Sequence, residues 1–499
     1  MKRKNLVTFV GVSVLCVGTL AGCGKTTPSS ASKTGDAKSA FTVTMMTAGG
    51  SLTHAAANSP LWQQLEKLTN ANIQVQWVDD SNYDSKVSVE LASGNPPAIM
   101  RLIHLNSDVT DAAQSGAFWD LGPYLKNYKY LNKINPIIYD NIKIDGQIYG
   151  IPAVRPLARF GIIYRKDWLK NLGLTPPKTM EQFYNMLYDF TYKDPDKDGK
   201  NDTYGMVVSQ DTFPFTELEG AFGVPFNYSV KNGKLTPAQE TPQYIQALEY
   251  FQKLYKNKLI NQNFSELPVN NWPQDFLNGK AGVIVGTADD AKGYVQQEPS
   301  LKGKIGVLGP LKGPDGTTYD YDTGGNDGMF VIPKSTVKTV ADLKKVLSFM
   351  NAMCSPDVEN LLVYGVKNQN YKLVNGYAVP INTNNTKDTA QLNDLEELSP
   401  LLQSSETLTA KPTPLDKEVD NVENVVDMKY LLTDPTASLS SKTEAQDGTQ
   451  LTNLLNTAMM KFIAGQTDVS GIQAANQQWL KDGGQKMLSE LEAAYAKYK

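Results

Sequence analysis

Strand-forming and helix-forming runs alternate along residues 41–103, and this alternation constrains the fold more than any other feature of the chain. Three runs of strand-forming residues occupy 41–46, 73–77 and 98–103. The stretch 61–68 places Leu residues on one helical face, and Ser59 followed by Pro60 is typical of a helix start. A second helix is expected at 83–92. Strands alternating with helices predict parallel βαβ units, and ligands of such sheets lie beyond the carboxyl ends of the strands.

The chain is too long for a single hydrophobic core. It has 499 residues, so two or more lobes are expected. Further strands are expected at 281–285, 304–307 and 329–332, and a long helix at 451–463. Of the three cysteines, only Cys354 lies outside the first 23 residues, so the folded part is expected to form no internal disulfide.

The first 23 residues have the pattern of an export signal. Lys2, Arg3 and Lys4 precede an apolar run, 7–20, that is short for a membrane-spanning helix, which needs about 20 residues. The run ends in Leu-Ala-Gly-Cys, which resembles the lipobox of bacterial lipoproteins. We therefore expect cleavage after residue 22, lipid (palmitate) on Cys23, and a position on the extracytoplasmic face of the bacterial cell membrane. An ordinary secretory signal with a chance cysteine is the alternative.

Residues 23–40 are expected to form a lipidated flexible tether. The segment 24–40 contains no large apolar side chain, so it buries too little surface to offset its ordering entropy. The formal net charge of the whole chain is −4, and no basic run is present, which argues against a nucleic-acid partner. The sequence thus predicts a folded body tethered to a membrane, and we expect it to be a monomer.

Several segments, in order, resemble the family 1 extracellular solute-binding proteins of ABC importers, in particular their lipoprotein branch. These segments are LWQQLEKLTNANIQVQW, LASGNPPAIM, IDGQIYGIP, TPPKTMEQFYNML, DPDKDGKNDTYG and FLNGKAGVIVG. The resemblance implies a two-lobed α/β fold of the periplasmic-binding-protein type (type II), with hinge strands and a ligand cleft between the lobes. It also implies an oligosaccharide ligand and delivery to the permease subunits of an ABC transporter.

The same resemblance gives the expected lobe limits. The N-terminal lobe is expected to comprise 41–153 and 304–327, and the C-terminal lobe 156–302 and 330–499. Hinge crossings are expected near Pro152–Ala153, near Gly303 and near residues 325–329.

An acidic loop matches the first half of a calcium-binding EF-hand loop. Asp194, Asp196 and Asp198 stand at positions 1, 3 and 5, the carbonyl of Lys200 is available at position 7, and Asp202 stands at position 9. Alternate oxygens of a tight loop converge on one point, so a structural calcium ion is predicted. The position-12 glutamate is replaced by a glycine, and the acidic residue that closes the loop in related binding proteins is replaced by a threonine. A solvated acidic turn is the alternative.

Candidate ligand residues follow the predicted strands and hinge crossings. Sugar sites combine aromatic faces with fixed polar groups. The candidates for contact with the ligand are Thr47, Ser51, His54, Arg101, His104, Arg155, Trp272, Asn326 and Asp327. The arginines also suggest an acidic sugar.

The sequence offers little support for an enzyme, and no catalytic cofactor is expected. GxSxG, HExxH and a phosphate-cradling loop are all missing. A glycosidase needs only two carboxylates, which a sequence with 52 acidic residues does not exclude. A peptide-binding lipoprotein or a surface adhesin is the alternative function.

Overall fold

The computed structural model describes residues 41–49, 54–381, 386–400 and 406–498. The expected signal, the tether, Cys23 and Ser51 lie outside these residues. Among the described residues, no helix combines the length and the apolar character needed to cross a membrane.

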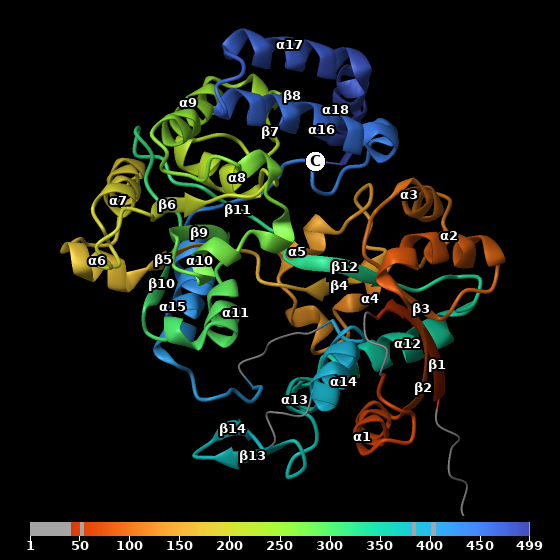
Figure 1. Ribbon diagram of the computed structural model, residues 1–499. Helices are drawn as coiled ribbons and strands as arrows, with labels where there is room; N and C mark the ends of the chain where they lie inside the picture. Colours follow the sequence, from red (N-terminus) through yellow and green to blue (C-terminus); the bar gives the residue numbers. More distant parts are fainter. Residues whose placement is uncertain (1–40, 50–53, 382–385, 401–405, 499) are drawn as a thin grey trace, which may run out of the picture. The chain divides into compact units, whose positions relative to one another are not determined.

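The first sheet has the strand order β2-β1-β3-β12-β4 (Figure 1). Its strands are β1 (Phe41–Ala48), β2 (Ala71–Val78), β3 (Ile99–Leu102), β4 (Gly150–Val154) and β12 (Asn326–Val331). β1 runs parallel to β2 and β3, whereas β12 runs antiparallel to β3 and β4. The predicted parallel βαβ start is therefore confirmed. Its first helix begins as expected, because the Ser59 side chain accepts a hydrogen bond from the backbone N–H of Trp62.

Eight helices pack apolar side chains into the core around the first sheet. They are α1 (Pro60–Thr69), α2 (Tyr83–Ser93), α3 (Ser107–Gln114), α4 (Gly122–Leu125), α5 (Pro136–Asn141), α12 (Val340–Met353), α13 (Pro356–Tyr364) and α14 (Thr386–Glu396). Cys354 is buried in this core as a free thiol. The core thus combines residues from the first and the last third of the chain.

The second sheet has the order β10-β5-β9-β6 and a separate core on each face. Its strands are β5 (Phe160–Arg165), β6 (Tyr204–Val207), β9 (Ala281–Thr287) and β10 (Ile305–Leu308). One core includes side chains of α6 (Lys166–Leu172), α7 (Met180–Tyr192), α8 (Phe213–Glu219), α9 (Pro242–Lys256), α16 (Lys442–Ile463) and α17 (Val469–Trp479). The other includes side chains of α10 (Gln274–Leu277), α11 (Asp290–Gln297) and α15 (Pro414–Asn421).

A smaller apolar cluster joins the end of the chain to a β-hairpin. The hairpin strands β7 (Tyr228–Lys231) and β8 (Lys234–Pro237) pack with α16, with Trp479 of α17 and with α18 (Gln485–Tyr498). Two further strand pairs are β11 (Asp320–Tyr321) with β15 (Leu431–Leu432) and β13 (Tyr371–Val374) with β14 (Tyr377–Pro380).

The expected lobe limits differ from the observed sheets in two places. Strand β10, expected with the N-terminal lobe as part of 304–327, pairs with β5 in the second sheet. The segment α12–α14, expected with the C-terminal lobe as part of 330–499, packs into the first core. The expected crossing near Gly303 is therefore wrong, because β9 and β10 on either side of it belong to one sheet. The chain changes sheets between β4 and β5, between β11 and β12, and between α14 and α15.

Candidate functional site

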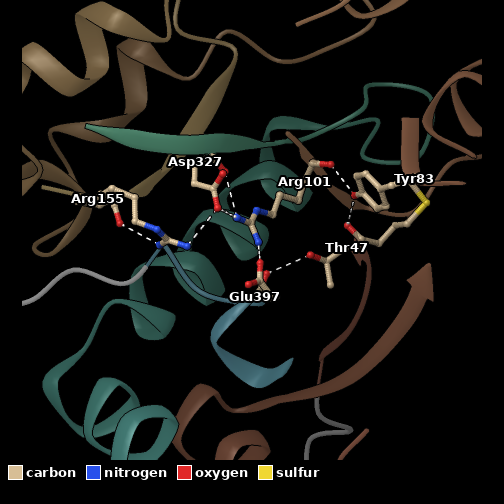
Figure 2. Close-up of polar contacts among 8 residues, drawn as sticks. Thr47, Tyr83, Arg101, Arg155, Asp327 and Glu397 are labelled. Atoms are coloured by element: carbon tan, nitrogen blue, oxygen red, sulfur yellow. Dashed lines mark hydrogen bonds and ion pairs between the residues drawn. The ribbon is translucent and has the colours of Figure 1, made fainter. Parts of the chain in front are cut away.

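Polar side chains from distant parts of the sequence meet at the carboxyl end of the first sheet (Figure 2). Thr47 lies on β1, Arg101 on β3, Asp327 on β12, Arg155 directly after β4, and Glu397 directly after α14. Four of these five were predicted as ligand residues. Glu397 was not, because its position in the fold depends on the unexpected packing of α14 against the first sheet.

Arg101 is the centre of this network. Its side chain is only 2% exposed. Its Nη2 donates to Asp327 Oδ2 at 2.8 Å and to the Asp327 carbonyl at 3.0 Å, and its Nη1 forms an ion pair with Glu397. Burial lowers the pKa of Arg101, and the negative charge of Asp327 opposes this shift. The backbone next to it is also held, because the Tyr83 hydroxyl donates to the Arg101 carbonyl at 2.5 Å.

The carboxylates of Asp327 and Glu397 balance the positive charge of Arg101. Thr47 is fully buried and donates to the Glu397 carbonyl at 3.2 Å. Arg155 is 26% exposed and donates to Asp327 Oδ2 at 3.2 Å, so it is the more accessible of the two arginines. The Thr47 hydroxyl and both terminal nitrogens of Arg101 are thus occupied by protein partners, whereas Arg101 Nε is buried without a hydrogen-bond partner among the described residues. Their contact with a ligand remains a prediction.

The other predicted residues of the first sheet lie apart from this network. The His54 ring stacks on Trp77, with 4.6 Å between ring centroids, and its Nδ1 lies 2.8 Å from Asp394 Oδ2. His104 lies 2.9 Å from Asp84 Oδ2. Asn326 donates to the Gly324 carbonyl and accepts from the Gly328 N–H, so its side chain holds the turn that leads into β12.

Aromatic side chains gather at the carboxyl ends of β6 and β9 in the second sheet. Trp272 is half-buried, and its Nε1 donates to the Val207 carbonyl at 3.0 Å. The indole lies over Gly286, where a Cβ would come within 3.5 Å of the ring. Phe160 and Phe213 pack with 4.9 Å between centroids, and both are half-buried. The two phenylalanines were missed, although Phe213, like Trp272, stands directly before a proline near the start of a helix.

A groove of about 560 Å³, which we call the outer groove, adjoins this aromatic edge. It lies between residues 210–212, directly after β6, and the last turns of α16. Its lining includes the amides of Gln210, Asn453, Asn456 and Gln466, which form no hydrogen bond within the described chain. An amide both donates and accepts, so these side chains suit a ligand rich in hydroxyls.

A second cavity, which we call the inner cavity, has a volume of about 340 Å³. The two spaces share Asn456 and both lie between α8 and α16. Thr216 and Glu219 of α8 line the inner cavity, whereas Thr212, one turn earlier, lines the outer groove. Neither space was predicted from the sequence. The apolar residues of α16 were interpreted as a face that packs into the core, and the polar face of this helix was not considered.

The acidic loop brings three of its carboxylates together. Oxygens of Asp194, Asp196 and Asp198 lie within 4.8 Å of one another. The Oδ1 atoms of Asp194 and Asp196 are buried without a hydrogen-bond partner in the described chain. Burial, followed by the hydrogen bond with Asp194 and the charge of Asp198, raises the pKa of Asp196. An all-oxygen donor set of this charge fits calcium.

The second half of the loop departs from the predicted ligand set. Asp202 is exposed and lies outside the group of three. The Lys200 ammonium lies 2.8 Å from Asp198 Oδ2. Thr203, at the position where related proteins have an acidic ligand, donates its hydroxyl to the Phe190 carbonyl at 2.8 Å and faces the end of α7.

Comparisons with known proteins agree with this architecture. The bacterial extracellular solute-binding protein family matches residues 50–360. Lipoprotein LipO of Bacillus subtilis is 37% identical over 447 residues, covering 88% of this chain and 89% of its own length. The polygalacturonan/rhamnogalacturonan-binding protein YtcQ of the same organism is 33% identical over 506 residues, covering 100% of both chains.

A solved structure gives the same fold. The Streptococcus pneumoniae ABC-transporter substrate-binding protein FusA, as an EF-hand mutant in complex with fructo-nystose, superposes with a TM-score of 0.62 at 19% identity. The match covers 92% of this chain and 99% of that one. The predicted two-lobed α/β fold is confirmed.

Proposed function

This chain belongs to the family of bacterial extracellular solute-binding proteins, and we propose that it captures a carbohydrate and delivers it to the permease of an ABC importer. Proteins of this family bind solutes and are not enzymes. The observation that carries the proposal is the similarity to YtcQ, which extends over the full length of both chains and whose name states carbohydrate binding. The ligand class is an oligosaccharide.

The geometry of the second sheet supports this ligand class. Pyranose rings have apolar faces that pack on aromatic side chains and hydroxyl rims that hydrogen-bond to polar groups. Trp272, Phe160 and Phe213 supply the first kind of surface, and the free amides of the outer groove supply the second. The groove and the inner cavity share Asn456, so one oligosaccharide would contact both spaces. Two lobes that each contact the ligand would close on it because the contacts to both form at once.

Replacement of Trp272 tests the proposed site. Trp272→Ala is expected to weaken binding of an oligosaccharide about three- to tenfold, because stacking contributes roughly 0.5–1.5 kcal/mol. Titration calorimetry with pectic and neutral oligosaccharides measures the affinity, and chemical denaturation of the same variant measures stability. Tyr188→Ala, which removes an exposed ring on α7, is the control and should leave the affinity unchanged. A folded wild type that binds peptides and no carbohydrate would contradict the proposal.

Lipid anchoring at Cys23 completes the proposed function. The Leu-Ala-Gly-Cys motif and the similarity to lipoprotein LipO support it. Cys23→Ala is expected to release the protein from the membrane or to leave the precursor uncleaved, because the cysteine both carries the lipid and fixes the cleavage point. Fractionation and intact mass spectrometry measure this. A variant that stays membrane-bound with its mass starting after residue 22 would exclude the anchor.

We further propose that the acidic loop binds a structural calcium ion through Asp194, Asp196 and Asp198. Chelation should lower the melting temperature, because the ion stabilises only the folded state by RT ln(1 + [L]/Kd). Asp198→Asn should remove this sensitivity and leave most of the carbohydrate affinity, since no residue of the loop lines the outer groove or the inner cavity. Asp315→Asn, in an exposed turn of the same lobe, is the matched control. An unchanged wild-type melting curve in the presence of chelator would show that the loop is only an acidic turn.

A further inference from the structure

The inner cavity is lined by three carboxylates that serve no ion pair within the described chain. They belong to Glu219 at the end of α8, Glu444 in the first turn of α16, and Asp434 in the loop before α16. Tyr228, Tyr244 and Trp479 supply aromatic walls. The described residues that line this cavity include no lysine and no arginine. The outer groove differs, because its lining contains a lysine, Lys461, together with the carboxylate of Asp211.

Glu219 is the least satisfied of these carboxyl groups. Glu219 is only 5% exposed, and its Oε1 is buried with no hydrogen-bond partner in the described chain. A buried polar group without a partner costs roughly 1–3 kcal/mol, so such groups are retained where a ligand supplies the partner. Burial raises the pKa of Glu219 well above its usual range.

The neighbouring carboxyl groups make the cavity unfavourable for an additional anion. Asp434 accepts hydrogen bonds from the Asn227 amide at 2.7 Å and from the Thr436 backbone at 2.7 Å. Loss of hydration, together with the negative charge of Asp434, raises the pKa of Glu444. Burial thus makes a negative charge unfavourable at Glu219 and at Glu444. A ligand carboxylate placed among them would therefore be repelled or would have to bind together with a proton.

We propose that the inner cavity receives one end of the bound oligosaccharide and that Glu219, with Asp434 and Glu444, selects a sugar unit without a carboxylate at that end. This assignment rests on the proposed carbohydrate-binding function. A sugar hydroxyl supplies the missing partner of Glu219, and the aromatic walls contact the ring. A uronate is disfavoured because no cation lines the cavity to pair with its carboxylate. The protein thereby distinguishes the end unit of an oligosaccharide whose other sugar units lie in the outer groove.

Calorimetry with two ligands of equal length tests this selectivity. The probes are the α-1,4-linked galacturonate trimer and its carboxyl-reduced counterpart, in which each carboxylate is replaced by a hydroxymethyl group. Wild type is expected to bind the reduced trimer about tenfold more tightly, because a carboxylate buried among acidic groups without a counter-charge is unfavourable. Glu219→Gln removes one carboxylate without changing the shape of the side chain. It should raise the affinity for the galacturonate trimer, because an acidic group beside the uronate is gone. It should weaken the binding of the reduced trimer slightly, because an amide oxygen accepts a hydroxyl less strongly than a carboxylate does. The ratio of the two affinities therefore narrows.

Two further variants keep the result interpretable. Glu249→Gln lies on the exposed face of α9, whose Tyr244 lines the cavity, and should leave both affinities unchanged. Glu444→Gln removes a second carboxylate from the cavity. It replaces Glu219→Gln in the same experiment if Glu219→Gln fails to fold. Equal wild-type binding of both trimers, unaffected by Glu219→Gln, would overturn the selectivity alone. Binding of neither trimer nor any other carbohydrate would overturn the proposed function as well.

Discussion

A buried positive charge, that of Arg101, links distant segments of the first lobe. Arg101 lies inside the carboxyl edge of the first sheet, and its guanidinium contacts Asp327 and Glu397 (Figure 2). A charge removed from water costs several kcal/mol unless opposite charges and hydrogen bonds compensate. The three residues come from β3, β12 and the end of α14, so the pairing of Arg101 requires segments separated by more than two hundred residues to be in place. The discontinuous lobe is thus a condition for burying this arginine.

The same pairing determines what the first sheet can offer to a ligand. Because Arg101 is neutralised by its protein partners, a sugar carboxylate gains little from it, and Arg155 also contacts Asp327. In the second lobe, hydrogen-bonding groups without a partner among the described residues include the amides of the outer groove and Glu219 Oε1 of the inner cavity. The number of arginines near the predicted cleft is therefore a poor guide to the charge of the ligand. Charged groups that have no protein partner are a better guide to the charge of the ligand.

Local features of the sequence predicted the start of the fold correctly. Ser59 and Pro60 define a helix start through a hydrogen bond that depends only on neighbouring residues, and the runs at β1, β2 and β3 need no distant information. Pairing between distant strands cannot be predicted from neighbouring residues. Nothing in Ile305–Leu308 indicates that it pairs with β5, and the apolar face of α12 fits either core. The lobe limits failed at these two points for this reason.

The same contrast between local features and long-range packing applies to the candidate site. Trp272 was predicted from its position between Asn271 and Pro273 ahead of a helix, and it lies at the carboxyl edge of the second sheet. Asp194, Asp196 and Asp198 converge as their spacing predicts, because they lie within one tight loop. Glu397, the polar face of α16 and the inner cavity depend on how helices pack, so no local pattern indicated them. Local spacing thus predicted the site residues within single loops and missed those that tertiary packing brings together.

Denaturation of carboxamide variants tests most directly whether the buried charge of Arg101 organises the first lobe. Asp327→Asn combined with Glu397→Gln leaves the guanidinium buried without a counter-charge, so the free energy of unfolding should fall by about 3–5 kcal/mol. Adding Arg101→Met should recover much of this loss, because the apolar side chain needs no partner. The account is contradicted if the double variant loses less than about 1 kcal/mol, the usual worth of an exposed pair, or if Arg101→Met destabilises it further.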